Sequence, residues 1–201
     1  MCFGEYMNDE SWLIFPPYEA FYIESLLTHT VSAMESMEIV SNWIDLMVAD
    51  DVKALELPKP KLFDHLHNIA LQAASVSRYL WPSKSGENSI HKKRALKLRQ
   101  ALEIADDSPL KNRKLRNQME HFDERLDNYL AQDVVGEFIP AYVDFEPLNV
   151  EHPVHIFKAF YINRREFVLL GETHKMQHLC KELLRVHELL EQFSRTGHRL
   201  G

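Results

Sequence analysis

Arg116, Asn117 and His121 are the residues whose types and spacing best suit a chemical reaction. Histidine transfers protons near neutral pH because its unperturbed pKa is about 6.5, and arginine stays charged and can bind a phosphate through two hydrogen bonds. Asn117 precedes His121 by one helical turn, so its amide could orient the imidazole or contact the same anion. Together these residue types indicate acid/base chemistry on a phosphate ester without a metal.

One amphipathic helix over 107–132 is expected to carry these residues. Asp107 or Ser108 can cap its first turn, and Pro109 suits the first helical position. The face expected to point inward has apolar residues at spacings of three and four, namely Leu115, Met119, Phe122, Leu126, Tyr129 and Leu130. At about 100° per residue, the opposite face carries Asn117, His121, Glu124 and Asn128. Arg116 lies about 140° from His121 around this helix, so the two side chains point in different directions. This disfavours a site built within one helix and favours one that a second chain completes.

The pattern from Arg116 to His121, with four residues between the two and Asn117 directly after the arginine, resembles the motif of the HEPN superfamily. The resemblance covers roughly residues 18–132. It implies a helical bundle and, as in active members of that family, an endoribonuclease that needs no metal and shares its site between two chains. It therefore implies a homodimer in which His121 is the general acid/base, Arg116 binds phosphate and Asn117 supports them.

RNA cleavage fits these residue types. A proton must leave the ribose 2′-hydroxyl, the phosphate charge must be stabilised, and the leaving 5′-oxygen must gain a proton. Arg113 and Arg125 flank the polar face, and together with Lys114 they are the expected RNA-binding residues. Ten basic and four acidic residues lie between positions 84 and 116, although the whole chain has a formal net charge of −7. By family analogy, the protein partner would be an antitoxin or a nucleotidyltransferase-type protein.

Simpler interpretations account for the same residues. Arg116 and Glu120 are spaced as a surface ion pair, and His121 could be an exposed or interface histidine. The basic window is equally well explained as a solvated helix face. The alternative function is therefore a non-catalytic module that binds RNA, a nucleotide or a protein partner through this face.

A metal-binding helical bundle is a third hypothesis, since the chain has eleven histidines. His174 and His178 would lie one turn apart on a final helix, with Glu172 nearby. The Glu-x-x-His repeats of di-metal bundles are absent, however. The sequence also lacks a glycine-rich phosphate loop and a Gly-x-Ser-x-Gly elbow. We therefore expect no metal and no cofactor.

The remaining elements follow from periodicity and turn residues. Helices are expected over 18–50, 61–81, 89–105 and 172–195, and a hairpin over 154–161 and 166–170. The predicted fold class is mainly α: an up-and-down four-helix bundle with a small C-terminal β-hairpin and a final helix. Residues 1–132 would form the bundle. Residues 133–201 would form the hairpin and last helix, packed on the bundle as part of one domain.

The overall composition is ordinary for a globular chain of 201 residues, with 45% hydrophobic and 26% charged residues. The apolar runs are too short to cross a bilayer, and the first residues lack the pattern of a signal peptide. Cys2 and Cys180 are the only cysteines, so no disulfide framework is expected. The predicted location is the cytoplasm, without membrane association.

Overall fold

Two long helices pack together and provide much of the hydrophobic core. The computed structural model describes residues 12–83, 89–112, 114, 117–118, 121–131 and 135–200. Helix α1 (Glu19–Val48) and helix α2 (Lys59–Leu80) confirm the helices predicted over 18–50 and 61–81, and they pack against each other. Pro58 is the N-cap residue of α2, and Pro60 lies in its first turn, where a proline is suited because no N–H partner is needed. Helix α3 (Ile90–Ala101) follows, with the Ser89 side chain accepting from the Lys92 N–H at its start.

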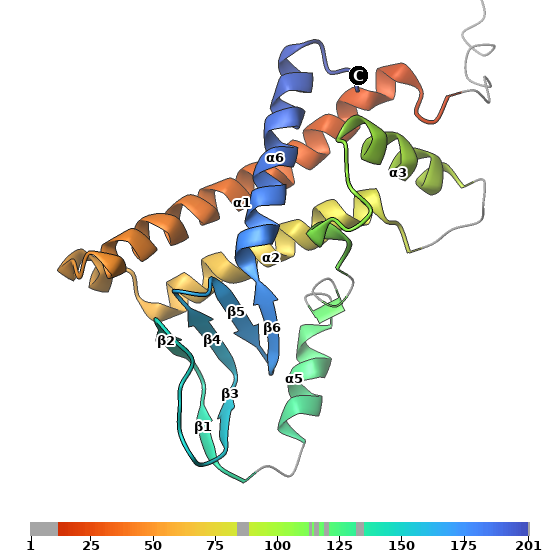
Figure 1. The fold of residues 1–201 in the computed structure, drawn as a ribbon. Coiled ribbons are helices and arrows are strands. Elements are labelled where there is room, and N and C mark those ends of the chain that lie inside the picture. Colours follow the sequence, from red (N-terminus) through yellow and green to blue (C-terminus); the bar gives the residue numbers. More distant parts are fainter. Residues whose placement is uncertain are drawn as a thin grey trace, which may run out of the picture.

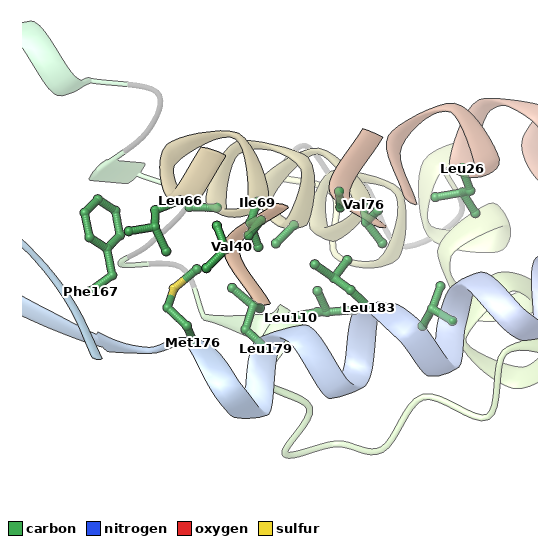
Figure 2. Close-up of a cluster of buried hydrophobic side chains, with 14 of the residues drawn as sticks. Leu26, Val40, Leu66, Ile69, Val76, Leu110, Phe167, Met176, Leu179 and Leu183 are labelled. Atoms are coloured by element: carbon green, nitrogen blue, oxygen red, sulfur yellow. The ribbon is translucent and has the colours of Figure 1, made fainter. Parts of the chain in front are cut away.

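Helix α6 (Met176–Arg195) crosses α1 and α2 rather than running alongside them (Figure 1). Its buried stripe is Met176, Leu179, Leu183, Val186 and Leu190. Figure 2 shows Met176, Leu179 and Leu183 turned toward Val40 of α1 and toward Leu66 and Ile69 of α2. These residues recur at alternating intervals of three and four, which confirms the helical period of the last helix from Met176 onward, and they close the main core.

Two sheets follow the short helix α5 (Phe122–Leu130) in the chain, one of two strands and one mixed sheet of four. Strands β1 (Glu137–Ile139) and β2 (Tyr142–Asp144) run parallel to β3 (Val154–Ile156) and β4 (Lys158–Tyr161), with the same register in both pairs. Pro140 separates β1 from β2, as expected of a residue without a backbone N–H. Strands β4, β5 (Glu166–Leu169) and β6 (Glu172–Lys175) are antiparallel neighbours, so the four-stranded order is β2-β4-β5-β6.

The two faces of this sheet pack differently. Phe160 of β4 lies opposite Phe167 of β5, and both are buried in the main core with the helices. Ala159, Tyr161 and Val168 form a smaller cluster on the other face. This alternation follows from the two-residue period of a strand. The helices therefore cover one face of the sheet, and that face provides the walls of the cavities described below.

The prediction of an up-and-down four-helix bundle with one hairpin is wrong. Helix α5 lies beside β6 rather than alongside α1 and α2, and α6 crosses the long helices (Figure 1). The predicted hairpin is present as β4 and β5, but it is part of a four-stranded sheet, and residues 154–156 pair with β1 instead. Residues 172–175 form β6 rather than the first turn of the last helix. Pairing with β5 satisfies the backbone N–H and C=O groups of residues 172–175. This pairing outweighs the helical sequence pattern, which the structure follows only from Met176 onward.

Glu19 joins the start of α1 to the far end of the chain. Its side chain is buried, and its Oε2 accepts from Arg199 Nε and from the Leu200 N–H, both at 3.0 Å. Lys97 Nζ of α3 lies 4.0 Å from Oε1. Because a buried carboxylate needs such partners, Glu19 holds three segments together. Within the described ranges, no helix is long and apolar enough to cross a membrane.

Replacing this carboxylate should weaken the fold. Glu19→Gln keeps the size of the side chain but removes its charge, and we expect the free energy of unfolding to fall by about 2 kcal/mol. Glu24→Gln is the matched control because Glu24 is an exposed glutamate on the same helix, paired with His198. Urea denaturation should show a change of less than about 0.5 kcal/mol for that control. Equal losses in the two variants would contradict the role given to Glu19.

Candidate functional site

The segment that carries the predicted site is not one continuous helix. Asn117 and Gln118 are helical, but His121 has φ −124° and ψ 42° and is the N-cap residue of α5. Backbone hydrogen bonds still link the turns, from the His121 N–H to Asn117 O and from the Arg125 N–H to His121 O, both at 3.1 Å. Asn117, His121 and Arg125 therefore lie on successive turns, although the helix is interrupted at the histidine.

Gln118 attaches this segment to the sheet. Its side chain is fully buried; Nε2 donates to Leu169 O at 2.7 Å, and Oε1 lies 2.6 Å from His174 Nε2. The Gln118 amide nitrogen donates to Leu169 O, so the atom that faces His174 is the amide oxygen, which can only accept. His174 Nε2 therefore carries the hydrogen of this bond. Burial lowers the pKa of His174, which favours the neutral imidazole, while Glu172 opposes this shift. Helical spacing alone does not reveal this role of Gln118.

The predicted polar face is exposed, as expected for Asn117, His121, Glu124 and Asn128. The side chain of His121 is 57% exposed, and its Nδ1 lies 3.6 Å from Glu124 Oε2. Asp123 and Glu124 occupy the first turn of α5, where negative charge is favourable to the helix dipole. The acidic residues beside His121 therefore have a structural role in starting this helix.

The other predicted residues are placed as follows. Arg125 forms an ion pair with Glu172 of β6 at 3.1 Å, so it ties α5 to the sheet. Lys114 is exposed. Arg113 and Arg116 lie outside the described residues. Among the predicted catalytic residues, the structure therefore places Asn117 and His121 one turn apart.

The apolar face predicted for this helix is only partly buried. Phe122, Leu126 and Tyr129 are half-buried, and Leu130 is 61% exposed. The remaining two predicted inward residues, Leu115 and Met119, lie outside the described residues. Within α5 itself no residue is fully buried, because this helix packs on the edge of the sheet rather than inside a bundle.

An aromatic cleft of about 440 Å³ is lined by Phe122, the residue that follows His121 in the chain, although His121 itself is not part of the lining. Its four phenylalanines come from four places in the chain: Phe63 of α2, Phe122 at the start of α5, Phe157 between β3 and β4, and Phe167 of β5. The Phe122 and Phe157 rings lie 6.1 Å apart. Lys158 Nζ lies over the rings of Phe63 and Phe157, at 5.1 and 5.5 Å from their centroids. The cleft thus combines aromatic rings with a positive charge.

His67 adds a titratable group to this cleft. Its ring meets the Phe122 ring edge to face at 5.9 Å. Burial lowers the pKa of His67, and the charge of Lys158 acts in the same direction, while Asp64 opposes them. A lowered pKa keeps the imidazole neutral around neutral pH, so it can accept a proton. The aromatic cleft therefore contains a candidate base as well as a cation.

The structure does not contain the helical His174/His178 pair on which the metal-binding hypothesis was based. His174 belongs to β6 and is buried against Gln118, whereas His178 is exposed on α6, so the two do not form a helical i, i+4 pair. Among the described residues, no group of three or more histidine, cysteine, aspartate or glutamate side chains could hold a metal ion.

The chain matches no protein-family model, no curated protein and no solved structure. The site is therefore interpreted from its own geometry. Sequence reasoning missed Phe157, Lys158 and Phe63 as members of one cleft. Asp64 and His67 are three residues apart on α2, and this spacing does not indicate that His67 would face Phe122.

Removing the Gln118 side chain should detach the site from the sheet. Gln118→Ala leaves Leu169 O and His174 Nε2 without their buried partner, and we expect a loss of about 3 kcal/mol in the free energy of unfolding. The control is the neighbouring exposed residue: Asn117→Ala should change it by less than about 0.5 kcal/mol. Chemical denaturation measures both. Similar values for the two variants would contradict the anchoring role.

The lowered pKa values of His67 and His174 predict a loss of stability on acidification. In the unfolded chain both should titrate near 6.5, and in the folded chain they titrate lower. Between the folded and unfolded pKa values the unfolded chain binds more protons, so the free energy of unfolding falls as the pH drops through this window. Urea denaturation from pH 7.5 to 5.0 measures this slope. His67→Gln should flatten it, whereas a slope unchanged from that of wild type, or flattened equally by the exposed His178→Gln control, would contradict the assignment.

Proposed function

We propose that this chain binds single-stranded RNA in the aromatic cleft and cleaves it without a metal, with His121 as a general acid/base. The observation that carries the proposal is the position of His121. Its side chain is exposed, and it directly precedes Phe122, one of the phenylalanines that line the cleft. The proposal keeps the chemistry implied by the HEPN motif and not the bundle fold.

The cleft suits RNA because it offers both kinds of contact that single-stranded nucleic acids use. Bases stack on aromatic side chains, and each stacked base contributes about 1–3 kcal/mol. Phe63, Phe122 and Phe157 provide such rings. Lys158, positioned over two of them, provides a cation for a phosphate. Stacking depends little on base identity, so we expect weak sequence preference.

The proposed reaction is an internal transfer at phosphorus. The ribose 2′-oxygen attacks the adjacent phosphorus, the bond from phosphorus to the 5′-oxygen breaks, and the products are a 2′,3′-cyclic phosphate and a 5′-hydroxyl. One group takes the 2′-hydroxyl proton and another gives a proton to the leaving oxygen. His121 is proposed for one transfer, and His67, which lines the cleft, is proposed for the other.

A second copy of the chain would complete this site. Arg116 is proposed, on its sequence position alone, to bind the phosphate, and a partner chain could present it to the His121 of the first. In that case the specific activity should rise with protein concentration over the range in which sedimentation shows dimer formation. The proposed non-catalytic alternative is a module that binds RNA through the same cleft.

Binding is tested with a fluorescent oligouridylate in EDTA. Phe122→Leu keeps an apolar side chain but removes the ring, and we expect about 5- to 100-fold weaker binding by fluorescence anisotropy. The control is Phe21→Leu, since Phe21 is a 70% exposed phenylalanine on α1, and it should bind as wild type. Equal affinity of wild type and Phe122→Leu would contradict the assignment of RNA to this cleft.

Cleavage is tested with the same RNA in EDTA by following the cyclic phosphate product. His121→Gln should lower the rate about 10²- to 10⁴-fold, because it removes the proton-transferring group and keeps a polar side chain. His178→Gln replaces another exposed histidine and should keep the wild-type rate. If wild type binds RNA but does not cleave it, the catalytic proposal fails and the binding module is supported.

A further inference from the structure

A second cavity, of about 270 Å³, lies between α1, α2, the sheet and α6. Its floor consists of buried apolar side chains: Val40, Ile44, Leu66, Ile69, Phe160 and Met176. Ser41, Gln177, Lys181 and Leu184 are more exposed and form its mouth. The cavity is therefore apolar inside and open to solvent on the α6 side.

Arg165 is the unusual member of this lining. It lies at the turn between β4 and β5 with φ +52°, a left-handed conformation that most side chains avoid. Its backbone is fixed on both sides, because its N–H donates to Ile162 O at 3.3 Å and its carbonyl accepts from the Met176 N–H at 3.0 Å. The turn and the start of α6 together hold this side chain at the cavity.

The Arg165 guanidinium is incompletely satisfied. Its Nη1 is buried and has no hydrogen-bond partner. A buried polar group without a partner is costly, and a charged one more so, and native structures usually provide a partner or a ligand. No carboxylate is among the described residues that line this cavity, and Lys181 at the mouth is a second positive charge. The cavity therefore has an excess of positive charge over an apolar floor.

We propose that this cavity binds an apolar monocarboxylate of the size of a medium-chain fatty acid. The carboxylate would accept hydrogen bonds from the Arg165 guanidinium, whose planar geometry matches two carboxylate oxygens. The alkyl chain would lie on the floor between Leu66 and Ile69 of α2 and Phe160 of β4. At about 30 Å³ per water-sized group, the volume accommodates roughly nine groups, close to the ten non-hydrogen atoms of octanoate.

This site is separate from the proposed RNA site. The aromatic cleft is lined by Phe63, His67 and Phe167, whereas the second cavity is lined by Leu66, Ile69 and Phe160. The two proposals therefore share no lining residue, and either can fail without the other.

Calorimetric titration of the full chain with octanoate tests the proposal. We expect saturable binding of one octanoate to wild type, and at least tenfold weaker binding of octan-1-ol and octylamine, because neither offers a negative charge to Arg165. Arg165→Met should weaken octanoate binding at least tenfold and bring it close to that of octan-1-ol. Lys181→Met should have a smaller effect, of a few fold, since Lys181 is exposed at the mouth.

The adjacent arginine provides the matched control. Arg164 is exposed and forms an ion pair with Glu146 at 3.0 Å, and it is not part of the cavity lining. Arg164→Met should therefore bind octanoate as wild type does. Octanoate should raise the melting temperature of wild type and of Arg164→Met, but not that of Arg165→Met. Arg165→Met alone should melt no lower than wild type, because it removes a guanidinium nitrogen that is buried without a partner, and an unchanged melting temperature shows that the variant is folded.

Three results would overturn the proposal. Octan-1-ol could bind as tightly as octanoate, which would mean that the cavity does not recognise a carboxylate. Arg164→Met could lose as much affinity as Arg165→Met, which would mean that a general surface charge is responsible. Wild type could show no binding at millimolar octanoate, which would mean that the cavity does not accept this class of ligand.

Discussion

The pair of hydrogen bonds made by Gln118 is the constraint on which the candidate site depends. They connect the segment before α5 to β5 through Leu169 and to β6 through His174. With this anchor in place, Phe122 faces His67 and Phe157, and His121 remains at the surface. Arg125 and Glu172 repeat the attachment two turns later, but as a half-exposed ion pair, which is intrinsically weaker. The buried glutamine therefore sets where the site lies on the sheet.

The sequence predicted the long helices well and the sheet poorly, and the reason is physical. Helices α1, α2 and α6 have apolar residues at helical spacing over many turns, and this signal is local. The parallel pairing of 137–144 with 154–161 is not local, because each strand of three or four residues is stabilised by a partner seventeen positions away. At 172–175, strand pairing replaced a helical pattern that was correct only from Met176 onward.

For the site, the sequence identified the exposed face but not its surroundings. The polar face was correctly predicted from the helical period, since Asn117, His121, Glu124 and Asn128 are all exposed. Gln118 has a polar side chain in a polar stretch, and only tertiary hydrogen bonds explain its complete burial. The cleft joins residues 63, 122 and 157, which no spacing rule connects. The role proposed for Arg116 still rests on the motif alone.

The buried carboxylate of Glu19 also affects how fast the chain folds and unfolds. It joins residues 180 and 181 positions apart, so closing this loop directly in the unfolded chain would be entropically expensive. The contact becomes inexpensive only after α6 has docked on α1 and brought the ends together. A contact that forms this late is largely absent from the transition state for folding, so its strength acts mainly on the rate of unfolding. We therefore expect Glu19 to contribute kinetic stability by slowing unfolding, with the rate of folding nearly unchanged.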